Sequence, residues 1–333
     1  MRRILSAAAA IIIGISASGQ EKRMAVVETS TCYMRIAPDY ESALETQELM
    51  GTVVEIVDEK GYWREILSPQ PYKAWTTEKT LVEMTAEQLK EYEAAPKYMF
   101  TRLYGHVFSA PSHKSSTICD LVGGDVLRSI PQKGKPVIKG GWTKVMLPSG
   151  KIGWVKKKAV KTLGQRIDIR KGDLATGLVS TQKMEDIISS AMQLLGVPYF
   201  WGGMSAKGVD CSGLVRISAI MNDILLPRNA SQQVFCGKGI EVPRHDIKDR
   251  TEAEVKKNYN SEIAQEAISQ LNRGDLVFFG NTQTGRITHV GIYLGGGEII
   301  HASHMVRINS LIPGTDNYYE NAHRLIKACR LCH

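Results

Sequence analysis

One cysteine of the chain stands where a reactive thiol is expected. Residues 196–215 read GVPYFWGGMSAKGVDCSGLV, so a glycine-rich loop gives way to an amphipathic helix at Asp210, Cys211 and Ser212. In the first turn of a helix, unpaired backbone N–H groups and the positive end of the helix dipole favour a thiolate over a thiol. The same N–H groups can bind an oxyanion. We therefore predict that Cys211 is a nucleophile.

A nucleophilic cysteine needs a base, and two histidines lie in strand-like segments further along the chain. His289 lies in ITHVGIY and His301 in IIHAS, with LGGGE between them as a hairpin signal. If the loop holds an odd number of residues, such as 294–296, His289 faces His301 directly, whereas a two-residue loop would place them on opposite faces. We interpret His289 as the base and His301 as the residue that orients it.

Each histidine taken alone would more often be a structural or surface residue, so the hypothesis depends on the combination. His304 competes with His301, but its odd offset directs it to the other face of the strand.

The elements that must position these residues indicate an α+β arrangement for residues 175–330. Apolar residues from Met184 to Leu195 follow helical spacing, and Gly196 and Pro198 end that helix. A second helix begins near Cys211. Strand-like runs follow at 276–279, 287–294 and 298–304. Helices that precede strands are typical of an α+β domain.

The N-terminal half contains two similar β-rich segments. Residues 24–83 and 97–162 share the order strand, Gly-Tyr-Trp or Gly-Gly-Trp, strand, turn, x-Trp, which indicates an internal duplication. Both resemble bacterial SH3-like domains, and the resemblance implies two small β-barrels; one larger β-sandwich is the alternative. Residues 84–96 are expected to form a linker helix, with Thr85 and Gln88 as a capping box.

The segments DCSGLV, THVGIYLG and IIHAS resemble those of the NlpC/P60-type bacterial cell-wall cysteine peptidases, a papain-like α+β fold. The resemblance implies Cys211 as nucleophile, His289 as base and His301 as the third residue. It also implies that Tyr199 lines the site near the oxyanion. With two SH3-like modules in front, the layout is similar to that of the γ-D-glutamyl-L-diamino acid endopeptidases, whose substrates are peptidoglycan stem peptides with a free N-terminal L-Ala.

A free ammonium group requires carboxylates and hydroxyls around it, and several residues are candidates. Asp210 and Ser212 flank the nucleophile, although Asp210 could equally be the helix N-cap. The resemblance implies an acid and a tyrosine from the first module, for which Glu45 and Tyr72 are candidates; a solvated barrel surface is the alternative.

Further candidates near the site are Tyr199, Trp201 and Asn229. For Tyr199 and Trp201 the alternative is core packing. Relatives often carry Asp at the position of Asn229, which puts the requirement for a free N-terminus in doubt.

The first 20 residues are typical of a signal peptide. Arg2 and Arg3 precede an apolar run that is too short to span a membrane and ends in small residues. We expect an exported protein, periplasmic or secreted, without stable membrane insertion. A net charge of +8 from scattered basic residues indicates no nucleic-acid partner.

Six cysteines at irregular spacings do not form a disulfide framework. Cys329 and Cys332 form a C-x-x-C that is a weak signal for a metal or redox site, because no second ligand pair is evident.

Three functions remain open from the sequence. The first is a cysteine endopeptidase acting on muropeptide fragments as a monomer, with no metal or organic cofactor. The second is a DL-endopeptidase on intact wall, with the SH3-like modules as anchors. The third is a non-catalytic wall-binding protein. Closure of the site by the first module would favour the first function.

Overall fold

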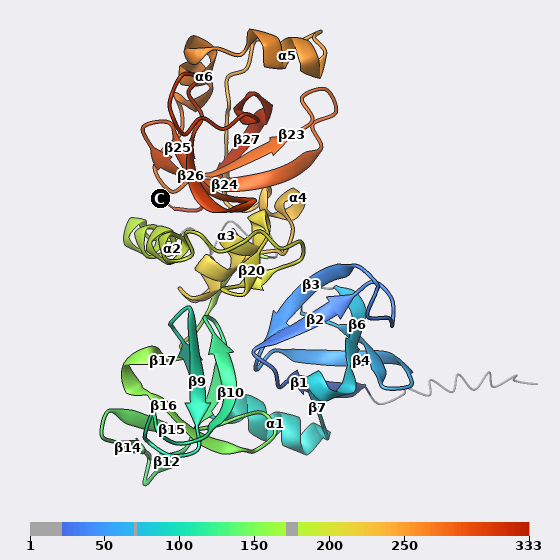
Figure 1. The fold of residues 1–333 in the computed structure, drawn as a ribbon, viewed down its shortest axis with the longest axis vertical. Helices are drawn as coiled ribbons and strands as arrows, with labels where there is room; N and C mark the ends of the chain where they lie inside the picture. Colours follow the sequence, from blue (N-terminus) through green and yellow to red (C-terminus); the bar gives the residue numbers. More distant parts are fainter. Residues whose placement is uncertain (1–21, 70–71, 171–178, 333) are drawn as a thin grey trace, which may run out of the picture.

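The computed structural model describes residues 22–69, 72–170 and 179–332, and three large β-sheets follow one another along these ranges (Figure 1). The expected signal peptide, residues 1–20, lies outside the described residues. No helix within the described ranges has the length and apolar character needed to cross a bilayer.

The first sheet is built from the first β-rich segment. Its strands are β1 (Arg23–Val27), β2 (Thr31–Arg35), β3 (Leu44–Leu49), β4 (Val53–Lys60), β5 (Trp63–Leu67), β6 (Lys73–Thr77) and β7 (Leu81–Met84), with a 3-10 turn η1 (Glu78–Thr80) before β7. The strand order is β3-β2-β6-β5-β4-β1-β7. The capping box of Thr85 and Gln88 is confirmed, and it opens helix α1 (Ala86–Ala94).

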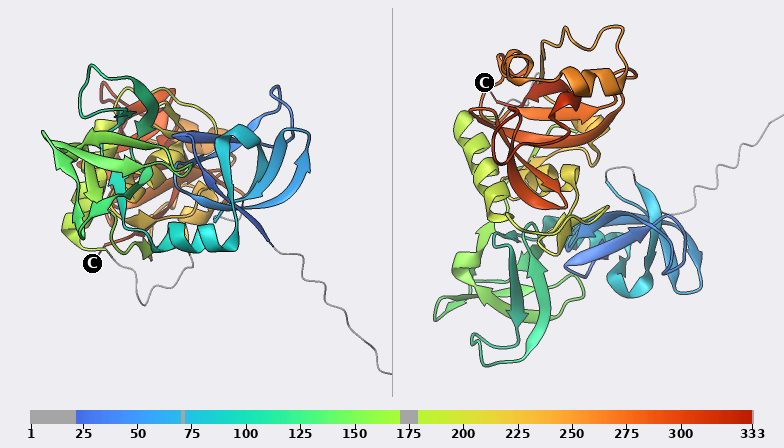
Figure 2. Two further views of the ribbon diagram at one scale, coloured as in Figure 1. Left: turned by 90° about the horizontal axis from the view of Figure 1, so that it is seen from below. Right: turned by 45° about the horizontal axis from the view of Figure 1, so that its top comes forward.

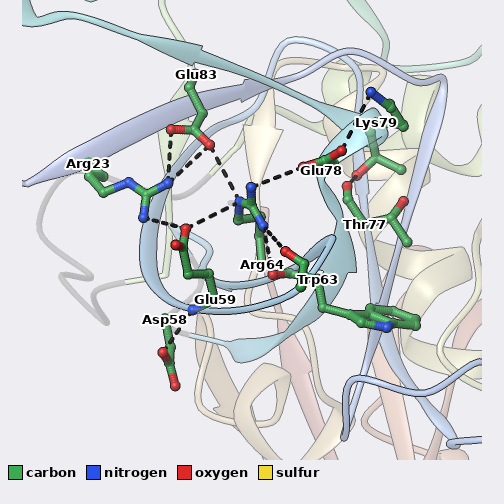
Figure 3. Close-up of polar contacts among 11 residues, drawn as sticks. Arg23, Asp58, Glu59, Trp63, Arg64, Thr77, Glu78, Lys79 and Glu83 are labelled. Carbon is green, nitrogen blue, oxygen red and sulfur yellow. Dashed lines mark hydrogen bonds and ion pairs between the residues drawn. The ribbon is translucent and has the colours of Figure 1, made fainter.

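Two arginines and three glutamates link the strands of the first sheet (Figure 3). Arg23 on β1 pairs with Glu59 on β4 and Glu83 on β7. Arg64 on β5 lies within ion-pair distance of both glutamates and also pairs with Glu78 on η1. Shared partners hold these side chains in one network, which loses less side-chain entropy per pair than isolated surface pairs do.

The second sheet repeats the topology of the first. Its strands are β8 (Lys97–Phe100), β9 (Tyr104–Phe108), β10 (Thr117–Val122), β11 (Val126–Ser129), β15 (Trp142–Met146), β16 (Ile152–Lys156) and β17 (Val160–Thr162), with a short β14 (Ile138–Lys139) on β15. A small ribbon, β12 (Pro131–Gln132) with β13 (Lys135–Pro136), and a 3-10 turn η2 (Lys157–Ala159) complete this part.

The order β10-β9-β16-β15-β11-β8-β17 matches the first sheet strand for strand, so the internal duplication is confirmed. Each sheet encloses its own hydrophobic cluster, which contradicts the alternative of one larger sandwich. In both sheets the hydrogen-bonded path described by the structure runs from one edge strand to another and does not close. The expectation of closed barrels is therefore wrong at the level of strand pairing.

The C-terminal part joins helices to a six-stranded sheet. The helices are α2 (Thr181–Gln193), α3 (Cys211–Ile220), α4 (Ala230–Gln233), α5 (Glu252–Asn258), α6 (Ser261–Ile268) and the 3-10 turn η3 (Ala322–Arg324). The strands are β22 (Lys238–Ile240), β23 (Leu276–Gly280), β24 (Ile287–Gly295), β25 (Glu298–Ser303), β26 (Met305–Ser310) and β27 (Leu325–Arg330), in the order β22-β27-β23-β24-β25-β26. Two short pairs precede the sheet: β18 (Ile167–Asp168) with β21 (Ile224–Leu225), and β19 (Met204–Ser205) with β20 (Gly208–Val209).

Helix α3 lies at the centre of the molecule. Its ten residues are all buried, and the apolar ones belong to one cluster with apolar residues of α2, β24 and β25. Figures 1 and 2 show the α2–α3 layer between the six-stranded sheet and the two N-terminal sheets. The amino group of Lys207, between β19 and β20, pairs with Asp120 of the second sheet at 2.6 Å and donates to Ser30 of the first at 2.9 Å. All three parts therefore meet beside the start of α3.

Glycine allows the loop before α3 to pack directly on the helix. A Cβ at Gly213 would lie 2.1 Å from the carbonyl oxygen of Gly203 and 3.0 Å from an Asp210 carboxylate oxygen. Gly213→Ala should therefore lower the free energy of unfolding by about 1–3 kcal/mol, because neither backbone can move freely. Urea titration followed by circular dichroism measures this change.

Ser218→Ala in the same helix is the matched control. The buried Ser218 hydroxyl has no hydrogen-bond partner within the described residues, so its removal should leave stability unchanged or raise it. Equal losses in the two variants would contradict the packing explanation.

Candidate active site

Cys211 is the first residue of α3 and is 7% exposed. Asp210 caps the helix, because its carboxylate accepts the N–H of Gly213 at 2.6 Å. The backbone oxygen of Asp210 accepts the N–H of Leu214. The first-turn donors that remain belong to Cys211 and Ser212, where an oxyanion beside the sulfur could bind. The thiol is free, so no disulfide blocks it.

Burial sets the protonation state of the thiol. It raises the pKa of Cys211 to about 11, and the negative charge of Asp210 acts in the same direction. The backbone N–H groups of Val290 and Ser212 and the charge of Arg228 lower the pKa, but by less. The expectation that the helix N-terminus makes this thiol acidic is therefore wrong for the free chain, in which Cys211 is a neutral thiol near pH 7.

His289 and His301 lie on the same face of the sheet, as expected. His289 Nε2 is 2.8 Å from His301 Nδ1. The direct partner of His301 across the β24–β25 ladder, however, is Gly291, so His289 is the diagonal neighbour and not the direct one. A bulge between Tyr293 and Gly295 sets this register. His304 is exposed in the turn after β25 at a φ of 63°, away from this pair.

The sulfur of Cys211 lies next to the backbone of the residue that follows His289. The N–H of Val290, the residue after His289, faces the sulfur. Burial lowers the pKa of His289 to about 3, with further repulsion from His301 and Arg324. A neutral imidazole beside a neutral thiol can accept its proton as the sulfur attacks, which is general-base activation.

A buried ion pair stands beside the nucleophile. Arg228, 2% exposed, donates to both carboxylate oxygens of Asp210, at 3.0 and 2.5 Å. It also donates to the Ser212 hydroxyl at 3.0 Å. The second carboxylate oxygen of Asp210 accepts from Gly202 N at 3.0 Å. The N-cap interpretation of Asp210 is therefore confirmed, and its charge is already neutralised by an arginine.

The first sheet packs against the loop that leads to Cys211. Thr46 on β3 accepts from Arg228 Nε at 2.8 Å, and Gln47 accepts from Met204 N at 2.9 Å. Tyr33 on β2 contacts Phe200 edge to face, with ring centroids 6.3 Å apart. The first module is thus fixed next to the helix N-terminus by buried polar contacts.

The remaining predicted residues differ in their surroundings. Burial raises the pKa of Tyr199, with contributions from Cys211 and Asp210, so its hydroxyl is within the electrostatic influence of both residues. Burial also raises the pKa of Tyr72, whose hydroxyl is within the electrostatic influence of Arg228, Glu45 and Asp210.

Trp201 and Asn229 lie at the surface. Trp201 is 69% exposed, which contradicts the core-packing alternative for this residue. Asn229 is exposed and immediately precedes α4. Glu45 is likewise exposed, on β3 of the first module.

Sequence reasoning missed several residues that shape the site. Arg228 stands next to Asn229 and gave no signal as a buried cation, because arginines are rarely so buried. Gly291 leaves room for the histidines, since a Cβ there would lie 3.2 Å from the Cβ of His301. The Tyr319 ring packs edge to face on the His301 ring, with ring centroids 4.6 Å apart.

The C-x-x-C near the C-terminus lies apart from these residues. Cys329 is buried on β27, and the backbone of Cys332 forms an isolated parallel β-bridge with that of Val179. The described residues hold no group of three or more His, Cys, Asp or Glu side chains arranged to bind a metal ion.

Fold and site together define a cysteine peptidase domain. Residues 196–324 match the NlpC/P60 family, and the chain carries a domain of that family. The matched range contains Cys211, His289 and His301.

Full-length relatives narrow the class further. A γ-D-glutamyl-L-lysine dipeptidyl-peptidase of Bacillus cereus is 28% identical over 83% of this chain and 73% of its own length. A protein of the same name from Bacillus subtilis is 27% identical over 91% of this chain and 87% of its own. The crystal structure of an NlpC/P60 family protein from Bacillus cereus covers 93% of this chain and all of its own, with a TM-score of 0.69 at 22% identity, and shares the fold.

Burial of the two histidines predicts acid sensitivity. The pKa values in the folded chain are lowered to about 3 for His289 and about 4 for His301, against 6.5 in the unfolded chain. Below pH 6.5 the unfolded chain binds protons that the folded chain excludes, so stability falls as pH falls. Each histidine should cost roughly 2 kcal/mol between pH 7.5 and pH 5.

Urea unfolding at these two pH values measures the loss. His301→Gln should remove about half of the pH-dependent loss of stability that comes from the two histidines. All other titrating groups remain the same. An unchanged pH dependence in this variant would contradict the assignment.

Proposed function

We propose that this chain is a cysteine endopeptidase that hydrolyses the γ-D-glutamyl–L-diamino acid bond of peptidoglycan stem peptides with a free N-terminal L-Ala. The observation that carries the proposal is the placement of the Cys211 sulfur at the backbone N–H of Val290, the residue after His289, with the first module packed on the loop before the nucleophile. The names of the two Bacillus relatives, which match over most of the chain, support the bond and the substrate class.

In the proposed reaction, Cys211 is the nucleophile and His289 the base. The thiol proton passes to His289 while the sulfur bonds to the scissile carbonyl carbon. The helix N-terminus stabilises the oxyanion, and Tyr199 lies beside it. The amide C–N bond then breaks, the amine leaves with the proton from His289, and a thioester remains. Water gives a proton to His289 and attacks the thioester, which releases the γ-D-glutamyl carboxylate and restores the thiol.

The first module supplies the proposed recognition of the substrate ammonium. Asp210 is already paired with Arg228, so another carboxylate must provide the negative charge. Glu45 and Tyr72 come from the first module, and the charge of Glu45 acts on the Tyr72 hydroxyl. We assign the ammonium to these two groups, with Ser212 as a further polar neighbour. Asn229 then need not supply the acid that relatives often carry there.

The wider setting is also part of the proposal. The two N-terminal sheets are interpreted as SH3-like modules before a papain-like peptidase domain, and residues 1–20 as an export signal. The protein would then act as a monomer outside the cytoplasm, without a metal or organic cofactor.

A DL-endopeptidase on intact wall is the second candidate: a bifunctional muramidase/DL-endopeptidase of Bacillus subtilis is 36% identical, but only over 36% of this chain. Contacts of the first module beside the nucleophile favour the first candidate.

Substitution of the proposed catalytic residues should separate their roles. Cys211→Ala should lower kcat/KM on a stem tetrapeptide by about 10⁴-fold or more, and His289→Ala by about 10³-fold. His301→Ala should cost only about 10–100-fold, because this residue orients the base. Mass spectrometry of L-Ala-γ-D-Glu release measures turnover. Retained activity in Cys211→Ala would rule out the peptidase mechanism and leave the wall-binding alternative.

Recognition of the free N-terminus is tested with paired substrates. Wild-type protein should cleave the free stem peptide and discriminate against its N-acetylated form. Glu45→Gln should lower the ratio of kcat/KM for the free peptide to kcat/KM for the acetylated peptide by about tenfold, because a charge-assisted contact is lost. Glu41→Gln, an exposed acid before the same strand, is the matched control and should leave the ratio unchanged. Equal cleavage of both substrates by wild type would favour the wall endopeptidase.

A further inference from the structure

The hydrogen-bond chain that begins at His289 does not end at His301. His301 Nε2 is 2.9 Å from Oδ1 of Asn309 on β26. Asn309 Nδ2 donates in turn to the backbone oxygen of Asn317 at 2.6 Å. His301 is fully buried and Asn309 is 6% exposed, so bulk water does not compete for these contacts.

Strand register places the side chains of His289, His301 and Asn309 next to one another on three adjacent strands. His301 pairs directly with Arg307 across the β25–β26 ladder, and Asn309 lies two residues further along β26, on the same face. His289 stands in the equivalent diagonal position on β24, two residues from Gly291. Three neighbouring strands thus each place one polar side chain on the same face, the one against which Tyr319 packs and not the one that packs against α3.

The chemistry of the terminal acceptor fixes the direction of every bond in the chain. A backbone carbonyl only accepts, so the group of Asn309 that faces Asn317 is the NH₂ and the group that faces His301 is the carbonyl oxygen. That oxygen also only accepts, so His301 Nε2 carries hydrogen. In a neutral imidazole the other nitrogen then accepts, and His289 Nε2 must donate to it. His289 Nδ1, the nitrogen nearer the backbone, is left with a free lone pair.

We propose that Asn309 is a positioning residue that holds both histidines in the Nε2–H tautomer, so that Nδ1 of His289 is always ready to accept the Cys211 proton. The inference rests on the proposed function in assigning that proton transfer. When it occurs, the proton moves from sulfur to Nδ1, Nε2 keeps its own, and no proton travels along the chain. Asn309 acts through His301 and touches no reacting atom.

A purely structural role for Asn309 is the competing explanation. Its contact with Asn317 ties β26 to the segment that follows, and loss of this contact would lower stability without selecting a tautomer. The two explanations differ in what they predict for the imidazole nitrogens, which can be observed without any substrate.

The test is ¹⁵N NMR of histidine-labelled protein at pH 7, combined with kcat and KM on the stem tetrapeptide. Wild type should show Nε2–H signals for both His289 and His301. Asn309→Leu removes the acceptor and should give mixed tautomers at His301, with kcat reduced about 10–100-fold and KM within threefold. A wild-type Nδ1–H signal at His289, or unchanged tautomers and kcat in Asn309→Leu, would overturn the proposal.

Asn222→Leu is the matched control, because its amide also donates to neighbouring groups, at the far end of α3. It should lower stability but leave both histidine signals and kcat unchanged. The NMR result decides the tautomers even if the stem peptide is not the substrate, so failure of the proposed function is distinguishable from failure of this inference.

Asn309→Asp covers the case in which the leucine variant does not fold. An aspartate oxygen accepts the same bond, so the tautomers should persist, while its charge should raise the pH at which His301 titrates by at least one unit. The charged or titratable groups around the histidines are Arg307 on β26, Arg324 on η3, Tyr319 and Cys211. Both arginines oppose protonation in either protein, so the comparison isolates position 309. An unchanged titration would contradict the proposed contact.

Discussion

The buried ion pair between Asp210 and Arg228 is the interaction on which the site depends. Asp210 caps the helix that begins with Cys211, and Arg228 connects that cap to the first module through Thr46. Although burial opposes it, Asp210 holds the pKa of Arg228 above its usual value. Removing one partner of such a pair typically costs 3–5 kcal/mol, because the other charge stays buried and unpaired. One contact thus couples helix geometry, module docking and nucleophile position.

Burial determines the charge of Cys211 and His289, the proposed catalytic pair, in the free chain. The same desolvation that raises the thiol pKa lowers that of the histidine, so neither group is charged before substrate binds. In the proposed reaction, the thiolate is then needed only while the sulfur attacks. In that proposal, negative charge develops beside the donors of the helix N-terminus, and fixed dipoles are most effective in such a dry site.

The two similar β-modules make different contacts with the peptidase part of the chain. Both modules have the same strand order, yet contacts with the loop before Cys211 come from β2 and β3 of the first. The second contacts the β19–β20 hairpin of the same loop through Asp120 and Lys207. In the proposed function, a module packed beside the nucleophile limits the substrates to short peptides. This restriction comes from assembly of the modules and needs no new catalytic residue.

Local patterns in the sequence were sufficient for much of this description. The glycine-rich loop before Cys211, the helix that follows, the Thr85 capping box and the strands that carry His289 and His301 all depend on neighbours within one element. The sequence could not decide the diagonal register of the histidines, which a bulge sets, or the burial of Arg228. It also could not show that desolvation outweighs the helix dipole at Cys211. Those properties depend on groups far apart in the chain, whose electrostatic and packing energies exist only once the tertiary structure has removed water from between them.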